Sequence, residues 1–307
     1  MLFSLLSSGS AAARTPLEIV GGRPERLTAA YWIERLPAPD DTLMPPAEIA
    51  AFNHRSLALK GALADVTELS DALPGEALRA AIRQLGDRID FHPFRPDGTP
   101  YGRIEVAEWI ANLNCDAIAE SNPVRFALIT RRAQMRRFPV SGPVRDQKLH
   151  PVVDKFDETA AFPGEAAAIL HDSRDRRWAL VRRGNYLAWM PSDALAVGGR
   201  EAVRAYRNAA DFLVVTAAGI AVAPPRGGQY GKERLQLDMG LRFPLLRERI
   251  DAAEDNAYRI AFPVRAGDGS LALEPVVIPR DPEVREGYLP YTRRNIIAQA
   301  FRFLGEP

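Results

Sequence analysis

The chain has 307 residues, a length that suits two or three domains of ordinary size. Its content of 47% hydrophobic and 26% charged residues is that of a globular protein and excludes a disordered chain. Forty basic residues against 39 acidic ones leave a net charge of +1, so no overall field draws the chain to nucleic acid. The longest apolar run is far too short to span a membrane.

The first residues are apolar and are followed by small ones. Leu2, Leu5 and Leu6 precede a serine- and alanine-rich stretch that would suit signal cleavage at residues 11–13. Residues 1–25 are therefore predicted to be an export signal or a disordered start. The first option places the protein in the periplasm or outside the cell.

Residues 26–121 show helical patterns separated by loops. One helix should begin at Pro46, where proline is favoured in the first turn. A second should end at Gly86, after apolar residues at helical spacing. A third is predicted over residues 104–112, with an inward-facing side formed by Val106, Trp109, Ile110 and Leu113.

From residue 122 the pattern changes to short strands separated by turns. Strands are expected over 126–130, 166–170, 178–182 and 187–190, with a tight hairpin turn at 183–185. Further strands are expected over 211–216, 241–245 and 258–264, with Asp268 and Gly269 in another hairpin turn. Strands of this kind predict two small β-barrels, over 122–200 and 201–285.

The last predicted element is a helix within residues 286–307. Thr292 is a suitable N-cap, and apolar residues follow at helical spacing: Ile296, Ile297, Ala300, Phe301 and Leu304. Such a stripe needs a surface to pack on, either the barrels or a further domain. The fold class is thus multidomain α+β, with a helical N-terminal domain, two small barrels and a terminal helix.

The chemistry-bearing residues do not form a recognisable catalytic or metal site. The four histidines are widely spaced, and no glycine-rich phosphate loop follows a strand, so neither a metal nor another cofactor is predicted. Cys115 is the one cysteine, and it is either a nucleophile with a histidine base or a small buried hydrophobe. The adjacent Asp116 carboxylate raises a thiol pKa, which favours the second interpretation. No catalytic residue is assigned.

Aromatic and guanidinium side chains gather on one predicted hairpin. Arg183, Tyr186 and Trp189 are the candidate substrate-binding residues, because aromatic faces beside arginines suit a sugar ring or a peptide with carboxylates. The alternative is that Trp189, together with Trp178, fills the core of the first barrel.

Several segments resemble the non-catalytic front part of bacterial NlpC-type cell-wall peptidases. Residues 122–126 and 133–139 resemble the opening of the SH3-like domain of these enzymes, and 163–190 resemble its later strands. Residues 211–245 are similar to a second SH3-like module. The helices of residues 26–121 resemble the N-terminal clip of the family. The segment from Tyr291 to Leu304 resembles the first helix of the catalytic domain, so the sequence is expected to stop before the catalytic cysteine motif.

The resemblance implies a hydrolase that cuts peptidoglycan stem peptides after γ-D-glutamate, using a cysteine nucleophile and a histidine base. These residues are not carried over to this sequence, so the chain as given is expected to be an inactive accessory region that supports the enzyme and lines its substrate groove. The alternative is a self-sufficient SH3-like protein that binds wall peptide or a protein partner. A coding sequence continuing past Pro307 into Trp-Gly-Gly and Asp-Cys-Ser-Gly would favour the first hypothesis. Oligomeric state is not predicted.

Overall fold

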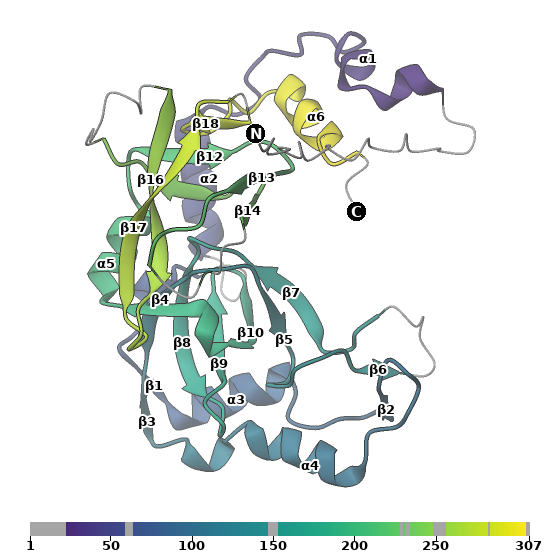
Figure 1. The fold of residues 1–307 in the computed structure, drawn as a ribbon, viewed down its shortest axis with the longest axis vertical. Coiled ribbons are helices and arrows are strands. Elements are labelled where there is room, and N and C mark those ends of the chain that lie inside the picture. Colours follow the sequence, from purple (N-terminus) through teal and green to yellow (C-terminus); the bar gives the residue numbers. More distant parts are fainter. Residues whose placement is uncertain are drawn as a thin grey trace, which may run out of the picture. The chain divides into compact units, whose positions relative to one another are not determined.

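The computed structural model describes residues 23–58, 64–146, 153–227, 230, 234–247, 256–281 and 283–304. The signal or disordered start predicted for residues 1–25 therefore lies almost wholly outside the described residues. Contacts divide the chain into two compact units (Figure 1). The smaller unit combines the described parts of Met1–Pro46 and Leu289–Pro307, and the larger unit is Ala47–Tyr288.

The smaller unit joins the two ends of the described chain. Its helices are η1 (Pro24–Leu27), α1 (Ala29–Ile33) and α6 (Arg293–Phe301), and α6 packs beside α1. Thr292 caps α6 as predicted, because its hydroxyl accepts a hydrogen bond from the backbone N–H of Asn295 at 3.2 Å.

The connection between the two segments of this unit is specific. The backbone at Thr42 forms an antiparallel bridge with Thr292, and Arg294 pairs with the Asp40 carboxylate at 2.5 Å. The predicted apolar stripe of α6 is only partly covered, since no residue of α6 is buried and Ile296 is 43% exposed.

The helices of the larger unit occur mostly before the strands. They are α2 (Pro46–Ala58), η2 (Val66–Glu68), α3 (Gly75–Leu85), α4 (Arg103–Asn112), η3 (Cys115–Ala117), η4 (Ser192–Ala194) and α5 (Arg200–Arg207). The three helices predicted before residue 122 are confirmed, and α3 ends at Gly86, whose N–H donates to the carbonyl of Ile82. The inward position predicted for Ile110 is wrong, since Ile110 is 38% exposed. Helix α5 was not predicted.

A seven-stranded antiparallel sheet forms the centre of the larger unit, with the order β11-β4-β8-β9-β10-β5-β7. Its strands are β4 (Arg125–Ile129), β5 (Ala133–Arg136), β7 (Asp157–Ala161), β8 (Ala166–Asp172), β9 (Trp178–Arg183), β10 (Tyr186–Pro191) and β11 (Leu195–Gly198). The predicted turn at 183–185 closes the β9–β10 hairpin. The strand order has two ends, β11 and β7, so the closed barrel expected for residues 122–200 stays a prediction.

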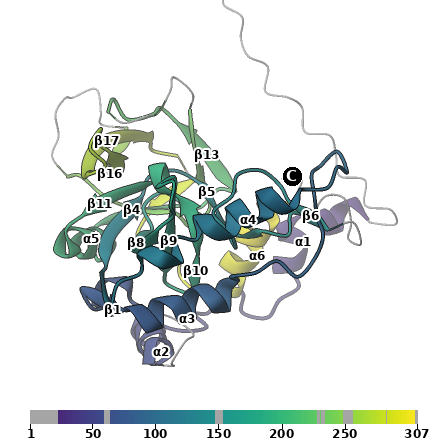
Figure 2. The same ribbon diagram turned by 90° about the horizontal axis from the view of Figure 1, so that it is seen from below.

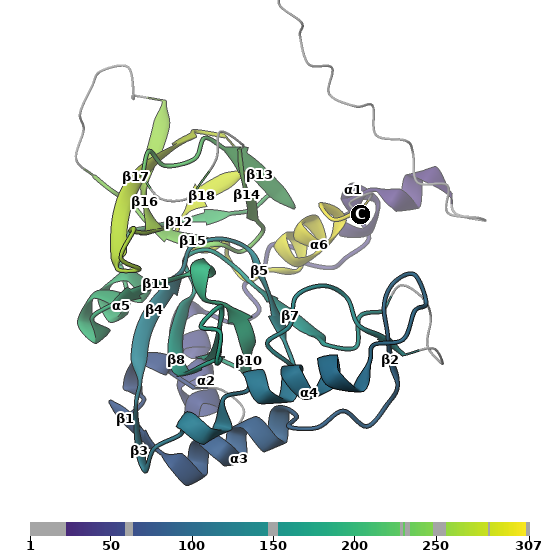
Figure 3. The same cartoon turned by 60° about the horizontal axis from the view of Figure 1, so that its bottom comes forward.

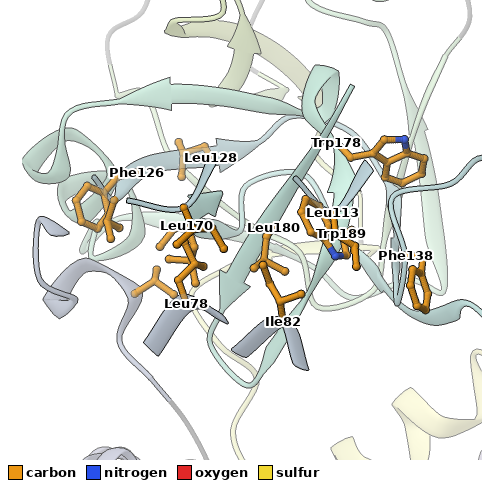
Figure 4. Packing of buried hydrophobic residues seen from close by; sticks show 14 of the residues in the cluster. Leu78, Ile82, Leu113, Phe126, Leu128, Phe138, Leu170, Trp178, Leu180 and Trp189 are labelled. Atoms are coloured by element: carbon orange, nitrogen blue, oxygen red, sulfur yellow. The ribbon is translucent and has the colours of Figure 1, made fainter. Parts of the chain in front are cut away.

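Both faces of this sheet are buried, with residues alternating between them along each strand. One face, the small-residue face, is mostly alanine with a few larger side chains such as Met135 and Ile169. The other, the helix-facing side, packs against α3 (Figures 2 and 3). Figure 4 shows Leu78 and Ile82 of α3 pointing toward Leu170 and Leu180 of the sheet. The helical region and the first strand region thus share one core.

Seven further strands of the described chain surround a separate hydrophobic core. They are β12 (Phe212–Val215), β13 (Gly219–Val222), β14 (Leu235–Asp238), β15 (Arg242–Pro244), β16 (Ala257–Arg265), β17 (Leu271–Pro279) and β18 (Val284–Glu286). Three predicted strands are confirmed here as β12, β15 and β16, and Asp268 and Gly269 lie in the β16–β17 turn. These strands form one three-stranded and two two-stranded sheets, so a second barrel also stays a prediction.

Two short strand pairs complete the larger unit. They are β1 (Ala72–Pro74) with β3 (Ser121–Pro123), and β2 (Pro93–Phe94) with β6 (Arg145–Asp146). Within the described ranges, none of the helices combines the length and the apolar character needed to cross a bilayer.

Candidate functional site

The β9–β10 hairpin places two of the three predicted binding residues side by side. Arg183 and Tyr186 are register partners next to the turn. Residues that face each other across an antiparallel pair lie on the same side of the sheet, and here that side is the small-residue face. Both side chains are partly buried at the end of this face.

Arg183 lines a cavity of about 320 Å³. The guanidinium forms an ion pair with Glu165, and only 14% of the arginine side chain is exposed. Gly164, also in the cavity wall, has a φ of 88°, and a Cβ there would lie 3.2 Å from the carbonyl oxygen of Arg242. The backbone at this turn therefore requires glycine.

Two further arginines and a buried tyrosine line the same cavity. Arg207 pairs with Asp65, while Arg242 donates to the carbonyl of Ala209 and lies 3.8 Å from the centre of the Phe212 ring. The Tyr206 hydroxyl donates to the carbonyl of Ala261 at 3.0 Å, and burial raises its pKa, so it stays neutral.

The charges in this cavity favour an anion. Three arginines line the cavity, and Glu165 and Asp65 pair with two of them, which leaves the Arg242 guanidinium without a carboxylate partner among the described residues. A guanidinium in a partly enclosed site suits a carboxylate or phosphate group.

Tyr186 binds a carboxylate that lines a second hollow. Its hydroxyl donates to the Glu158 carboxylate at 2.6 Å, and this hydrogen bond raises the pKa of Tyr186. Glu158 and Asp157 line a hollow of about 490 Å³ beside β5 and β7, and Arg132 is the one basic residue in its wall, so two carboxylates meet one guanidinium there. Burial and the Asp154 carboxylate raise the pKa of Asp157, as expected where negative charge is only partly balanced.

Trp189 does not lie with the other two residues. It is fully buried on the helix-facing side of the sheet, near Leu113 and Phe138 (Figure 4), and its indole N–H has no partner among the described residues. The prediction that Trp189 binds substrate is therefore wrong, and the core alternative holds for Trp189 and for the 7% exposed Trp178. Trp189 follows Tyr186 by three positions on β10, and an odd spacing on a strand directs side chains to opposite faces.

Among the described residues, Cys115 has no histidine base as a partner. Burial, then the carboxylates of Asp116 and Asp87, raise the pKa of the Cys115 thiol, the direction expected from the sequence. His171 Nε2 lies 3.1 Å from the carbonyl oxygen of Asn114 instead of the sulfur. Over the described residues, no group of three or more metal-ligating side chains is found.

Residues 152–191 match the SH3 domain family of the SH3b1 type. This SH3b segment contains β7 to β10, and with them both Arg183 and Tyr186. A search of curated proteins finds no match.

Several solved structures match the chain, among them two NlpC/P60 proteins. One is an NlpC/P60 endopeptidase from Photobacterium damselae subsp. piscicida, with 15% identity and a TM-score of 0.64, covering 86% of this chain and 58% of that chain. The other is an NlpC/P60 family protein from Bacillus cereus, with 17% identity and a TM-score of 0.36, covering 53% of this chain and 56% of that chain. The first likeness shows a shared fold, and the chain spans 58% of that endopeptidase's length.

A third hollow, of about 720 Å³, contains residues that the sequence did not single out. It lies partly inside and partly outside the SH3b segment and is lined by six arginines. They come from positions 131 to 265, so only the tertiary fold brings them together. The one available signal was the arginine pairs at 131–132 and 176–177, each beside a strand.

Proposed function

We propose that this chain is the non-catalytic region of an NlpC/P60-type cell-wall hydrolase, and that its SH3b segment forms part of the surface that holds a peptidoglycan stem peptide. The observation that carries the proposal is the likeness in fold to the Photobacterium endopeptidase over 86% of the chain. The match of residues 152–191 to the SH3b1 family supports it independently of structure. A periplasmic or secreted location is part of the same proposal.

In this proposal the Arg183 cavity binds a carboxylate of the stem peptide. Glu165 holds the Arg183 guanidinium in place through their ion pair, and Arg242 lies in the same cavity wall. A carboxylate entering this cavity would balance the excess guanidinium charge.

The hollow lined by Glu158 and Asp157 would receive an amino group of the same peptide. Glu158 is held by the Tyr186 hydroxyl, and Asp157 lies beside it on β7. Carboxylates in a partly buried hollow favour an ammonium group, such as that of a diamino acid. The diamino acid preferred is not assigned.

The test is titration of the chain with a soluble stem tetrapeptide that contains a diamino acid, followed by isothermal calorimetry. Arg183→Gln should weaken binding by about tenfold, the loss expected for one charge-assisted hydrogen bond. Arg182→Gln is the matched control, because Arg182 is the neighbouring residue on β9 and points to the other face of the sheet. Circular dichroism confirms that both variants fold.

Two results would overturn the proposal. One is the absence of binding to stem peptide and to purified wall sacculi by the folded wild-type chain. The other is equal affinity of the Arg183 and Arg182 variants, which would remove the cavity from the binding surface.

The expectation that this chain does not itself cleave the peptide is a separate part of the proposal. In the described ranges, Cys115 has a raised pKa and no histidine partner. Mass spectrometry of stem peptide incubated with purified chain should show no cleavage, and cleavage that survives Cys115→Ala would require a different nucleophile.

The SH3b match also favours a second candidate function, a binding protein that acts without a hydrolase domain. Both candidates predict binding of the stem peptide. They differ in whether fusing or adding an NlpC/P60 catalytic domain makes that domain cleave the bound peptide faster.

A further inference from the structure

The hollow lined by six arginines is a strongly basic feature of the larger unit. Its volume is about 720 Å³, and Asp193 is the carboxylate in its wall. The arginines lie in the β4–β5 connection, on β5, in the β8–β9 turn and at the end of β16: Arg131, Arg132, Arg136, Arg176, Arg177 and Arg265. We call this feature the arginine groove.

Three of these arginines have carboxylate partners. The Arg136 side chain is 3% exposed and pairs with Asp154 at 2.7 Å, so it is held within the protein and is not free to bind a ligand. Arg131 pairs with Asp193 at 2.5 Å. Arg132 is 62% exposed and lies 3.5 Å from its partner carboxylate, so that pair is weak.

The other three arginines leave positive charge unbalanced. Within the described parts of the chain, Arg176, Arg177 and Arg265 form no ion pair. The Nε of Arg265 is buried and has no hydrogen-bond partner there, and its Nη1 has only a long contact of 3.3 Å to the carbonyl of Ala266. Hydrogen bonds from Ser270 lower the pKa of Asp268, and the charge of the nearby Arg265 guanidinium adds to this effect.

The β8–β9 turn holds two of the unpaired arginines in place. The Asp175 carboxylate accepts from the Ser173 hydroxyl at 2.6 Å and from the backbone N–H of Arg177 at 2.9 Å. Arg176 has a φ of 58°, which is the left-handed conformation that closes the turn. Asp175 is therefore engaged within the turn, and the two arginine side chains extend from a fixed backbone.

We propose that the arginine groove binds a linear phosphate-bearing polyanion. Several guanidinium groups around one open groove match the multiple oxygen atoms and the repeated charge of a phosphate chain better than a single carboxylate. The lining contains one aromatic residue, Trp178, which is 7% exposed and offers no surface on which a nucleobase could stack. The ligand class is therefore a phosphate polymer without bases. This proposal does not depend on the proposed function.

The experiment measures binding of the full chain to fluorescently labelled linear polyphosphate across a salt series. The test variant is Arg176→Asn with Arg177→Gln, because asparagine tolerates the left-handed conformation at position 176. The matched control is Arg174→Gln with Arg103→Gln. It removes the same charge from exposed positions outside the groove, one of them in the same turn.

The wild-type chain should bind polyphosphate with an affinity that falls as salt rises. The test variant should bind roughly tenfold more weakly, and its slope of log affinity against log salt should fall by about 1.4, or 0.7 for each lost phosphate contact. The control variant should bind as the wild type does. Tripolyphosphate and a glycerol-phosphate polymer, used as competitors, distinguish an inorganic chain from a phosphodiester chain, and displacement by either supports the proposal.

Three results would overturn it. The first is no binding of polyphosphate at low salt by the folded chain. The second is equal loss of affinity in the test and control variants, which would indicate a general charge effect. The third is equal affinity for poly-L-glutamate of the same charge, which would remove the preference for phosphate. Stem-peptide titration of the test variant should be unchanged, so failure here leaves the proposed function untouched.

Discussion

Ile82→Ala tests whether helix α3 and the seven-stranded sheet share one core. Ile82 is 1% exposed and points toward Leu180 in the cluster on the helix-facing side of the sheet (Figure 4). If α3 contacted the sheet only loosely, truncation of this side chain would have little effect on the free energy of unfolding of the larger unit.

The expected loss of stability follows from the buried carbon atoms. Replacing isoleucine with alanine removes three methylene-sized groups, worth about 2.4 kcal/mol at about 0.8 kcal/mol each. The remaining cavity adds about 24 cal/mol for each Å³ that does not collapse. The free energy of unfolding of the larger unit should therefore fall by about 3 to 4 kcal/mol.

Urea denaturation followed by tryptophan fluorescence is the assay, because Trp178 and Trp189 lie in the same cluster as Ile82. The matched control is Ile104→Ala on α4, where the isoleucine is 77% exposed and the change should stay within about 0.5 kcal/mol. A loss below about 1 kcal/mol for Ile82→Ala would refute the shared core.

Three other predictions concern single residues. Burial raises the pKa of Tyr230 from 10.0 to about 12, so its contribution to stability is complete below pH 10 and is lost between pH 10 and 12. The free energy of unfolding of the Tyr230→Phe variant should therefore fall less steeply over that pH range, measured by urea denaturation at a series of alkaline pH values. Cys115 should react more slowly with iodoacetamide at pH 8 in the folded chain than in urea, and equal rates would contradict its raised pKa. Phe301→Ser should increase solubility without shifting the unfolding midpoint of the larger unit, and a large shift would show that α6 stabilises that unit.

Local signals in the sequence predicted the helices and hairpins well. Thr292 caps a helix and Gly86 ends one because these functions depend on the residue itself and its immediate neighbours. The turn at 183–185 was predictable for the same reason, because it depends on the residues of the turn itself. Helix α5 was not predicted because it is short, at eight residues, and carries three arginines; its Val203 and Tyr206 are buried because they meet the sheet.

The candidate site was predicted less completely, for two different reasons. The separation of Trp189 from Tyr186 was predictable, because strand residues an odd number apart lie on opposite faces. The cavity lined by Arg183 was not predictable, because Glu165 and Arg242 come to it from other parts of the chain. The arginine groove has the same origin, since β5 lies next to β10 and far from it in sequence.

The pairing of the two described ends has a consequence for biosynthesis. Asp40 and Arg294 are 254 residues apart, and the backbone bridge at Thr42 spans a similar separation. At translation rates of about 5 to 20 residues per second, the segment before α2 leaves the ribosome roughly 13 to 50 s before its partner helix is made. During that interval the larger unit can fold first, while α1, which contains Trp32 and Ile33, lacks its packing partner α6. The smaller unit is thus the last part of the chain to assemble, and a chain truncated directly after Tyr288 would contain the whole larger unit with an unpaired N-terminal arm.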